Sequence, residues 1–408
     1  MSGRDDCADL DRQDPLAGFR ERFALPDDVV YLDGNSLGAL PLTAARLLDG
    51  VVDREWGRGL IRSWNDADWI SAPRRIGDKL ARLCGAAAGE VIVADSTSVN
   101  LFKLLVSALR ARPDRGVILT QADNFPTDLY VAEGVAQLLG VGVRSVAAAE
   151  VESALDADVA VLYLTHVHFT SGAVHDVERL TRRAHDVGAL ALWDLSHSTP
   201  VVAVELDRWQ VDLAVGCGYK HLNGGPGAPA YLFVAGAVQE EMSAALPGWM
   251  GHADPFAFAP RYSPASGIAR HLSGTPGILA MAALEGGVDL WLEADLAAAR
   301  GKARALGDLF LDLVVARCGE HGLEVISPRR GQRGAHVSLR HDEGYRIMRA
   351  LIQRGVIGDV RPPGLMRFGF APLYTRYVDV HDAVTALSDV LATRAWDREE
   401  YATRAVVT

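Results

Sequence analysis

The sequence predicts an α/β fold, with a large domain whose mainly parallel sheet is sandwiched by helices and a smaller α/β domain. Through the middle of the chain, short apolar runs alternate with amphipathic stretches of helix length. Strands separated by helices form parallel sheets. From about residue 288 the alternation weakens, which indicates a smaller second unit. We therefore expect an N-terminal segment (1–50) that contributes to the small domain, a large domain (51–287) and a C-terminal small domain (288–408).

Hydrophobic periodicity predicts the elements of the large domain. The expected strands are Val91–Ala94, Val117–Thr120, Val159–Thr165, Ala189–Asp194, Val211–Cys217 and Ala228–Val234. The expected helices between them are Leu101–Arg110, Leu129–Leu139 and Val177–Val187. An Ala-rich stretch, Val288–Val315, predicts one long helix at the start of the small domain. Ligands of open α/β sheets bind beyond the carboxyl ends of the strands, so the residues after each strand are the candidates for chemistry.

Composition and charge exclude several classes of protein. The chain has 408 residues, with 41 Lys plus Arg against 52 Asp plus Glu, and a formal net charge of −11. An acidic surface disfavours binding to nucleic acid or to an anionic membrane. The acidic N-terminus and the lack of a long apolar run predict a cytoplasmic protein. The cysteines are far apart, in no metal or redox spacing, which predicts reduced structural thiols: Cys7, Cys84, Cys217 and Cys318.

Lysine is rare, and one of the four lysines has an unusual setting. Lys79 and Lys302 lie in polar helical stretches, and Lys103 lies in a helix from which its long stem could reach solvent. For these three we expect solvated surface positions. Lys220 instead follows an apolar strand and precedes a Gly-rich loop, where a ligand can come close to the backbone.

A strand-end aspartate precedes this lysine by 26 residues. Asp194 followed by Lys220 is the pattern that pyridoxal phosphate requires, since a lysine forms the Schiff base and a carboxylate keeps the pyridine nitrogen protonated. Ser96 and Thr97 begin a helix after a strand, where backbone N–H groups favour a phosphate. Phe125 follows another strand and could stack on a planar ring. Taken singly, the aspartate and the serine could equally be helix caps.

Taken together, these segments resemble kynureninase, a pyridoxal-phosphate enzyme of the aspartate-aminotransferase fold (fold type I). The resemblance covers nearly the whole chain. It rests on LDGNSLG (32–38), DSTSVNLFK (95–103), NFPTD (124–128), HVHFTSGAVHD (166–176), WDLSH (193–197), GYKHLNGGPG (218–227), GWMGH (248–252), SGTPGI (273–278) and RFGFAPLY (367–374). Cysteine desulfurases and related aminotransferases usually have His directly before the Schiff-base lysine, where this chain has Tyr219.

The resemblance implies a role for each matching residue. Lys220 would carry pyridoxal 5′-phosphate and shuttle protons, and Tyr219 would either donate a proton or only bind the phosphate. Arg367 would take the substrate α-carboxylate with its bidentate fork. The other implied cofactor contacts are Ser96, Thr97, Phe125, Asp128, Ser171, Asp194, His197, Trp249 and Thr275, the last two across a dimer interface. The implied substrate-side residues are Ser36, Asn35 and Trp64.

The implied activity is hydrolytic Cβ–Cγ cleavage of L-kynurenine to anthranilate and L-alanine in tryptophan catabolism. The same reaction on 3-hydroxy-L-kynurenine would give 3-hydroxyanthranilate. Thr275 stands where some relatives have Asn, and Trp64-Asn65 where some have His, so the preferred aryl group stays open. The family also implies a homodimer with shared active sites, with no nucleic-acid or membrane partner. No metal is expected, because His166 and His168 lack a carboxylate or cysteine at ligand spacing.

Two other functions fit parts of the pattern. A cysteine-desulfurase-like lyase of the same fold would need a mobile cysteine as persulfide carrier, for which Cys318 is the remote candidate. A non-catalytic, cofactor-binding sensor would carry a DNA-binding appendage, and the acidic sequence offers none.

Overall fold

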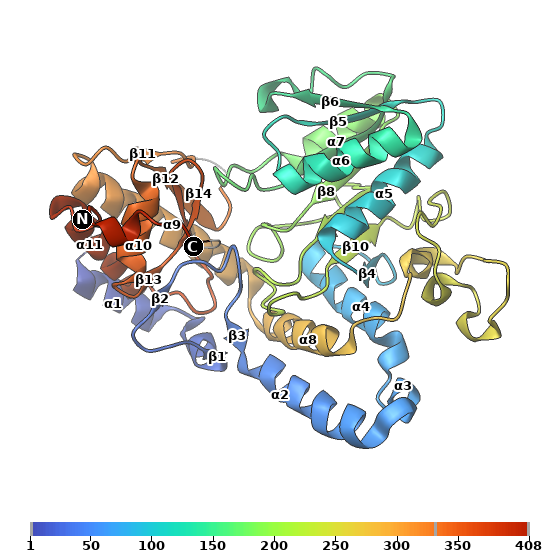
Figure 1. The fold of residues 1–408 in the computed structure, drawn as a ribbon, viewed down its shortest axis with the longest axis horizontal. Helices are drawn as coiled ribbons and strands as arrows, with labels where there is room; N and C mark the ends of the chain where they lie inside the picture. Colours follow the sequence, from blue (N-terminus) through green and yellow to red (C-terminus); the bar gives the residue numbers. More distant parts are fainter. Residues whose placement is uncertain (1–2, 330–332, 406–408) are drawn as a thin grey trace.

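A seven-stranded sheet forms the centre of the larger of two α/β units in the computed structural model, which describes residues 3–329 and 333–405 (Figure 1). The strand order is β4-β10-β9-β8-β7-β5-β6, and β10 runs antiparallel to both of its neighbours while the other pairs are parallel. The predicted fold class is confirmed. The strands are β4 (Val91–Val93), β5 (Val117–Gln121), β6 (Gly142–Val146), β7 (Val159–Thr165), β8 (Leu190–Asp194), β9 (Leu213–Gly216) and β10 (Tyr231–Val234).

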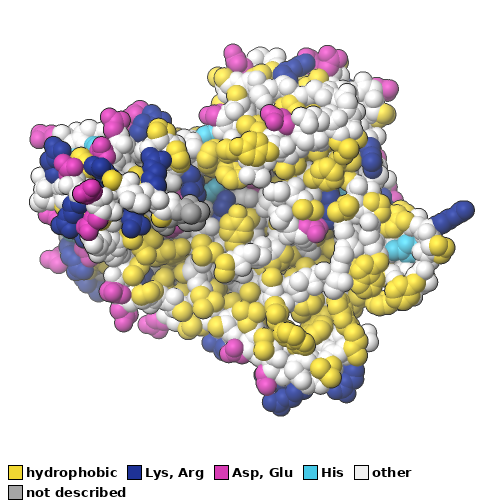
Figure 2. Space-filling view, viewed as in Figure 1, with side chains coloured by type: hydrophobic (Ala, Val, Ile, Leu, Met, Phe, Trp, Pro, Cys, Tyr) yellow, Lys and Arg dark blue, Asp and Glu magenta, His cyan; other side chains and the backbone are white. Residues whose placement is uncertain are grey.

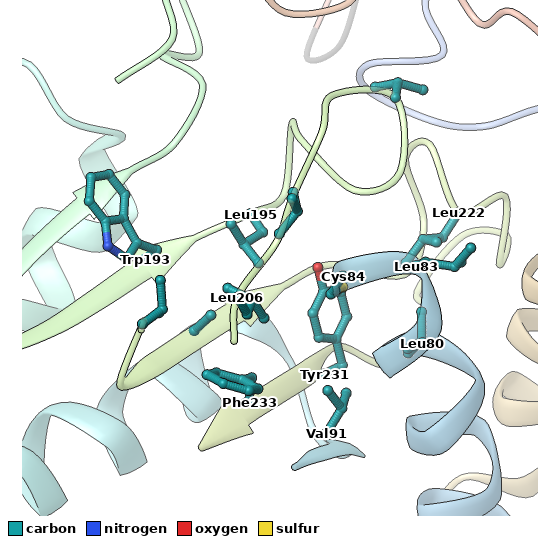
Figure 3. Packing of buried hydrophobic residues seen from close by; sticks show 14 of the residues in the cluster. Leu80, Leu83, Cys84, Val91, Trp193, Leu195, Leu206, Leu222, Tyr231 and Phe233 are labelled. Carbon is teal, nitrogen blue, oxygen red and sulfur yellow. The ribbon is translucent and has the colours of Figure 1, made fainter. Parts of the chain in front are cut away.

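Helices cover both faces of this sheet, and each face has its own hydrophobic core. In β10, Tyr231 and Phe233 belong to one core, while Leu232 and Val234 belong to the other. Figure 3 shows the first core, where Cys84 from a covering helix lies close to Tyr231. Burial on both faces explains why the strands are continuous apolar runs without polar alternation. The covering helices are α4 (Ala72–Cys84), α5 (Thr97–Ala111), α6 (Pro126–Leu139), α7 (Val177–Asp186) and α8 (Ile278–Glu293).

Two expectations about the elements are wrong. The strand β6 was not expected, because its sequence GVRSV is half-exposed and polar at the sheet edge. The single helix expected over Val288–Val315 is two helices, α8 and α9 (Leu296–Cys318). The break occurs at Asp295, whose backbone is extended and whose carboxylate accepts hydrogen bonds from the N–H groups of Ala297 and Ala298. An N-cap of this kind starts a new helix despite the helix-favouring alanines around it.

The smaller unit has a four-stranded sheet in the order β11-β12-β15-β14. Its pairs are all antiparallel, and His336 lies opposite Gly369 while Ser338 lies opposite Arg367. Three helices pack on this sheet and form a separate hydrophobic core. The elements are β11 (Glu324–Val325), β12 (His336–Arg340), β14 (Asp359–Arg361), β15 (Leu365–Gly369), α9, α10 (Gly344–Ile352) and α11 (Tyr377–Ala392).

The N-terminal segment joins the small unit and then crosses to the large one. Helix α1 (Arg4–Gln13) packs on α11, and β2 (Val30–Tyr31) pairs in parallel with β13 (Val356–Ile357). Further along, the N–H of Gly38 donates to the carbonyl of Tyr219 at 2.8 Å. A Cβ on Gly38 would lie 2.3 Å from the Lys220 carbonyl oxygen, so only glycine allows this close approach. The LDGNSLG segment therefore lies against the loop that contains Lys220.

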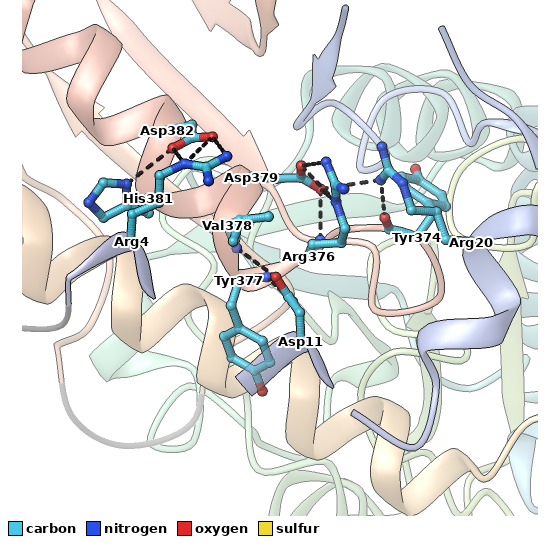
Figure 4. A network of polar contacts seen from close by, with 10 residues as sticks. All are labelled: Arg4, Asp11, Arg20, Tyr374, Arg376, Tyr377, Val378, Asp379, His381 and Asp382. Carbon is cyan, nitrogen blue, oxygen red and sulfur yellow. Dashed lines mark hydrogen bonds and ion pairs between the residues drawn. The ribbon is translucent and has the colours of Figure 1, made fainter. Parts of the chain in front are cut away.

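Polar contacts tie α1 to α11 (Figure 4). Both carboxylate oxygens of Asp11 accept hydrogen bonds, from Tyr377 N–H at 2.7 Å and from Val378 N–H at 3.0 Å. Asp11 therefore caps the start of α11 from a distant part of the sequence. Arg4 adds an ion pair with Asp382 at 2.9 Å.

An arm extends from the large unit through α2 (Leu42–Gly50), the π-helical segment η2 (Val51–Gly59), η3 (Leu60–Arg62) and α3 (Ser63–Asp66) (Figure 1). Large apolar side chains on the arm are exposed: Trp56 by 57%, Leu60 by 60% and Ile61 by 77%. Hydrophobic side chains cover much of the lower right of the molecule in Figure 2. An apolar area of this kind marks an interaction surface.

The expectation that three lysines are solvated is wrong for two of them. Lys103 is only 1% exposed, and its amine contacts Asp95 Oδ2 and donates to the His271 carbonyl at 2.7 Å. Lys302 is 7% exposed and pairs with Asp14 at 2.6 Å. All four cysteines are buried free thiols. In the described part of the chain, no helix is both long and apolar enough to span a bilayer.

Candidate active site

Lys220 and His197 meet at the carboxyl end of the parallel strands. Lys220 lies in the loop after β9 and His197 in the turn after β8, and Lys220 Nζ is 3.0 Å from His197 Nε2. His197 is 7% exposed, and burial, together with the nearby Lys220 charge, lowers its pKa well below the usual value. A neutral ring can accept a hydrogen bond from the amine. The two residues therefore form a coupled pair at the sheet edge where ligands bind.

Two buried carboxyl groups lie beside this pair. Asp194 ends β8 and Asp128 is in the first turn of α6, and they are 7% and 3% exposed. Burial raises the pKa of both groups, and in Asp128 the charge of Asp194 adds to the effect. Adjacent buried carboxylates cannot both ionise without a cationic partner. Asp194 Oδ1 accepts from the Ser196 N–H at 2.7 Å, while Asp128 Oδ2 has no hydrogen-bond partner among the described residues. This pair therefore fits a protonated ring nitrogen.

The start of α5 contains Ser96 and Thr97, the residues expected to bind an anion. Ser96 is its N-cap and Thr97 its first residue, and Ser96 Oγ accepts from the Val99 N–H at 3.4 Å, so it also acts as an ordinary cap. Next to it is a cavity of about 250 Å³ whose lining includes Asp95, Gly227, Ser273 and Thr275. The buried amine of Lys103 contacts Asp95 and the backbone of His271, so it links the two segments that border this cavity. The helix dipole and free N–H groups there suit a phosphate.

Phe125 presents an exposed aromatic face at the start of α6. Phe125 is the N-cap residue of α6, is 38% exposed, and packs edge-on against Phe169 with ring centroids 5.2 Å apart. Its remaining face can stack on a planar group. Ser171 follows in the same loop as Phe169, with its hydroxyl 3.2 Å from His168 Nδ1. The hydroxyl of Ser171 is thus engaged within its own loop.

Arg367 is held from several sides in the small unit. It lies on β15, is 2% exposed, and donates Nε–H to Asp359 Oδ1 at 2.8 Å and Nη1–H to the Phe169 carbonyl at 2.7 Å. Its Nη2 contacts Asp359 Oδ2 and donates to Ser36 Oγ at 3.2 Å. Ser36 in turn donates to Asp359 Oδ2 at 2.7 Å. The guanidinium is therefore oriented rigidly, with Ser36 next to it as expected.

Charge is concentrated around this arginine. Asp33 lies near Asp359, and burial together with that neighbouring charge raises the pKa of Asp33 to about 7. Arg361 pairs with Asp359 at 2.8 Å. Asn35 is fully buried against Gly369, where a Cβ would come 2.0 Å from the Asn35 amide oxygen. The N-terminal segment thus lines the site from the side of the small unit.

Tyr219 lies directly before Lys220, and its ring centroid is 5.8 Å from the lysine amine. Burial raises its pKa above the usual value of a phenol. The hydroxyl is therefore protonated at neutral pH and can donate a proton or a hydrogen bond.

Two expected site residues lie elsewhere within one chain. Trp64 is on α3 of the arm and packs edge-on against Trp69, with ring centroids 5.8 Å apart. Trp249 is 36% exposed and packs against Phe256 at 5.7 Å. The described contacts of these tryptophans do not include Lys220 or Arg367.

The sequence pattern did not identify Asp359, Lys103 or His336 as site residues. Asp359 had no local signal, because β14 is the short mixed segment DVR and Asp359 meets Arg367 only through the pairing of β14 with β15. Lys103 and His336 had none, since burial and contacts between distant segments define both positions. No group of three or more His, Cys, Asp or Glu side chains within residues 3–329 and 333–405 is arranged to hold a metal ion.

Full-length relatives decide which family this site belongs to. The kynureninase of Pseudomonas fluorescens is 49% identical over 416 residues and that of Burkholderia pseudomallei 50% identical, each covering 100% of both sequences. The chain belongs to the kynureninase family. The family model described as the kynureninase C-terminal domain also matches, over residues 299–387.

Solved structures support the fold of this kynureninase-family chain. A cysteine desulfurase from Escherichia coli superposes with a TM-score of 0.76 at 20% identity, covering 93% of this chain and 98% of its own. One from Thermococcus onnurineus has a TM-score of 0.79 at 16% identity, with 92% and 98% covered. Identities this low establish the fold alone. The desulfurase alternative is less well supported, because Cys318 is 0% exposed at the end of α9 rather than on a mobile loop.

Proposed function

We propose that this chain catalyses the hydrolytic Cβ–Cγ cleavage of L-kynurenine to anthranilate and L-alanine, with pyridoxal 5′-phosphate as cofactor. Identity of about half of all positions to kynureninases over the full length carries this proposal. The oxygen of a water molecule joins the γ-carbon while the Cβ–Cγ bond breaks. One water proton ends on the β-carbon and the other is released, so that the products are anthranilate and alanine.

The residues present fit the cofactor. Pyridoxal phosphate supplies an electron sink that stabilises negative charge at the substrate Cα. The unpartnered buried oxygen of Asp128 beside Asp194 supports a protonated ring nitrogen at that place. Each part of the cofactor would then have a binding residue. Lys220 would bond to the aldehyde carbon, Asp194 and Asp128 would bind the ring nitrogen, and Phe125 would stack on the ring. Ser96 and Thr97 would bind the phosphate, with His197 and Ser171 nearby.

The chain's own groups then bind substrate and move protons. Arg367 would bind the α-carboxylate, and its contacts with Asp359 and Ser36 pre-orient the fork, so that little ordering remains to be done on binding. Lys220 Nζ would take the Cα proton, since His197 beside it, whose pKa is lowered by burial, is too weak a base to compete for that proton. Tyr219, kept protonated by burial, would give a proton to the β-carbon.

We also propose a homodimer in which the arm binds a second copy. The exposed Trp56, Leu60 and Ile61 and an apolar pocket lined by Val51, Trp56, Trp69, Ile278 and Leu279 support an apolar contact there. In such a dimer, Trp249, Thr275 and Trp64 would complete the partner's site, with Trp64 a candidate for the aryl pocket.

We propose a cytoplasmic location and a role in tryptophan breakdown, on the basis of the kynureninase family and of the free cysteines. Buried, unpaired cysteines suit the cytoplasm, and the products suit tryptophan catabolism through the kynurenine pathway, including supply to NAD biosynthesis. The division into 1–50, 51–287 and 288–408 is likewise kept as a proposal.

The first experiment is a spectrum and an assay on purified protein supplied with pyridoxal phosphate. A yellow protein that absorbs near ~420 nm is expected, with the band lost in Lys220→Ala and kept in Lys79→Ala as the matched control. Anthranilate formed from L-kynurenine is then followed by fluorescence, beside 3-hydroxy-L-kynurenine and L-cysteine. A colourless protein, or sulfide from cysteine without anthranilate from kynurenine, would overturn the proposal.

A further inference from the structure

One face of the small-unit sheet carries a histidine that the reaction as described does not use. His336 lies opposite Gly369, and Ser338 lies opposite Arg367. Directly paired residues of antiparallel strands share a face, as do alternate residues along a strand. His336, Arg367 and Ser338 therefore project to the same side. Ser338 contacts the Thr170 carbonyl and Arg367 donates to the Phe169 carbonyl, so this face lies against the loop after β7 at the cofactor site.

The ring of His336 lies next to the Lys220 pair. Its centroid is 5.5 Å from that of His197, whose Nε2 is 3.0 Å from Lys220 Nζ. His336 is 0% exposed, and neither of its ring nitrogens has a hydrogen-bond partner among the described residues. Asn35 lies on the same face, in the space left by Gly369, and both polar atoms of its amide are also unpartnered there.

Buried polar atoms without a partner destabilise the folded protein, because they lose their hydrogen bonds to water and gain none in return. Native proteins satisfy such atoms with a bound molecule, most often an ordered water with several polar neighbours. Asp194 is already the proposed partner of the cofactor's ring nitrogen, and Arg367 is the proposed partner of the substrate α-carboxylate. The remaining reactant of a hydrolytic cleavage is water.

We propose that His336, with Asn35, positions the water molecule that adds to the γ-carbonyl of the substrate, an inference that rests on the proposed function. The uncharged imidazole has one donor and one acceptor, so it can accept a proton of the water in a hydrogen bond and direct the oxygen lone pair outward. The water oxygen bonds to Cγ as the Cβ–Cγ bond breaks, and it becomes a carboxylate oxygen of anthranilate. His336 is thus a positioning residue that acts through the water.

The test compares two reactions of the same holoenzyme, of which only one consumes water. Anthranilate formation from L-kynurenine needs the water, whereas exchange of the Cα proton of L-alanine in D₂O, followed by proton NMR, does not. In His336→Leu we expect kcat for kynurenine to fall about 100-fold, the size of effect that loss of reactant positioning causes, with alanine exchange at the wild-type rate. His336→Gln retains a donor and an acceptor and is expected to recover most of kcat.

His166→Leu is the matched control, because His166 is buried too, at 2% exposure, and has an unpartnered Nδ1 among the described residues, but it packs on Trp193 and Trp209. It should leave both rates unchanged. If the leucine variant does not fold, His336→Phe takes its place, because it keeps a ring and removes both nitrogens. The rates of kynurenine cleavage and of alanine proton exchange are then measured in that variant. A crystal structure of the holoenzyme should also contain a water hydrogen-bonded to His336.

Equal loss of both rates in the His336 variants, wild-type cleavage in them, or a holoenzyme crystal structure without that water would overturn the inference. A wild-type enzyme that exchanges the alanine proton but makes no anthranilate would instead contradict the proposed function.

Discussion

Arg367 is fixed in one orientation before any substrate binds. Its side chain is buried, and a carboxylate, a hydroxyl and a carbonyl hold it in one orientation. A surface arginine would lose side-chain entropy on binding, whereas this one has already lost it on folding. Little side-chain entropy therefore remains to be lost when Arg367 binds an α-carboxylate.

Arg367→Ala tests this at the residue scale. The change should lower kcat/KM for L-kynurenine by about 100-fold, or ~3 kcal/mol, because a desolvated charge pair with the substrate is lost. The cofactor absorbance should not change, since Arg367 contacts none of the proposed cofactor holders. Steady-state kinetics and the visible spectrum measure the two effects, with exposed Arg340→Ala on the neighbouring strand as control. Unchanged kinetics would refute the role of Arg367.

Elements in this fold are completed by residues from distant parts of the chain. Asp11 of α1 accepts hydrogen bonds from the first two N–H groups of α11, in addition to the local bond from the Arg376 N–H to Asp379 (Figure 4). Sequence patterns near Tyr377 cannot reveal this, because the cap is not a local residue. Similarly, the cap at Asp295 divided what local composition predicted to be one helix.

Asp11→Ala should lower the free energy of unfolding by about 1 kcal/mol, the usual contribution of an N-cap. Urea denaturation of the whole protein, followed by circular dichroism, measures this change. The control is Asp27→Ala, which changes an aspartate in an exposed turn. Equal stability of the two variants would show that solvent replaces the cap without cost.

The arm exposes large apolar side chains that only a second copy of the chain could cover in the proposed dimer. Ile61→Asp places a charge in the proposed dimer contact, where burying it without a partner is unfavourable. We expect a dimer for the wild type and a monomer with little activity for the variant, by light scattering and the anthranilate assay. Leu138→Asp changes a leucine on α6, away from the arm, that is also well exposed (63% against 77% for Ile61), and this variant should stay dimeric. A monomeric wild type, or a dimeric Ile61→Asp, would contradict this.

The whole molecule buries several neutral histidines, which links its stability to pH. Burial lowers the pKa of His166 and His221 to about 3 and that of His271 to about 4. The unfolded chain binds protons at these positions below pH 6.5 while the folded protein does not. Their contribution is thus complete above pH 6.5 and is lost as the pH falls toward the folded pKa values. Asp33, with its pKa raised to about 7, opposes them.

His166→Leu isolates one of these contributions. As the pH falls from 6.5 to 5, the wild type should lose stability more steeply than the variant, with a difference that approaches about 1.4 kcal/mol per pH unit, because only the wild type has that histidine to protonate on unfolding. Urea unfolding at several pH values gives both slopes. Parallel slopes would mean that His166 is protonated in the folded protein.

Much of the site was predictable because its chemistry sits at strand ends. Asp194, Lys220, Ser96 and Phe125 each follow an apolar run, and parallel strands bring such positions to one edge. The same reasoning could not find Asp359 or His336. Their importance comes from register across an antiparallel sheet and from a face turned toward the other unit.

The sequence alone predicted the fold class, the positions of the main strands along the chain and the lysine at the strand end, since these depend on local periodicity and on residue types with few other uses. It did not determine where each charge lies. Three lysines had the same polar or helical surroundings in the sequence, yet two of them are buried in ion pairs with distant segments. Burial is a property of the packed chain, and a charge can be buried only where the fold brings it a partner. Tertiary structure alone decided that.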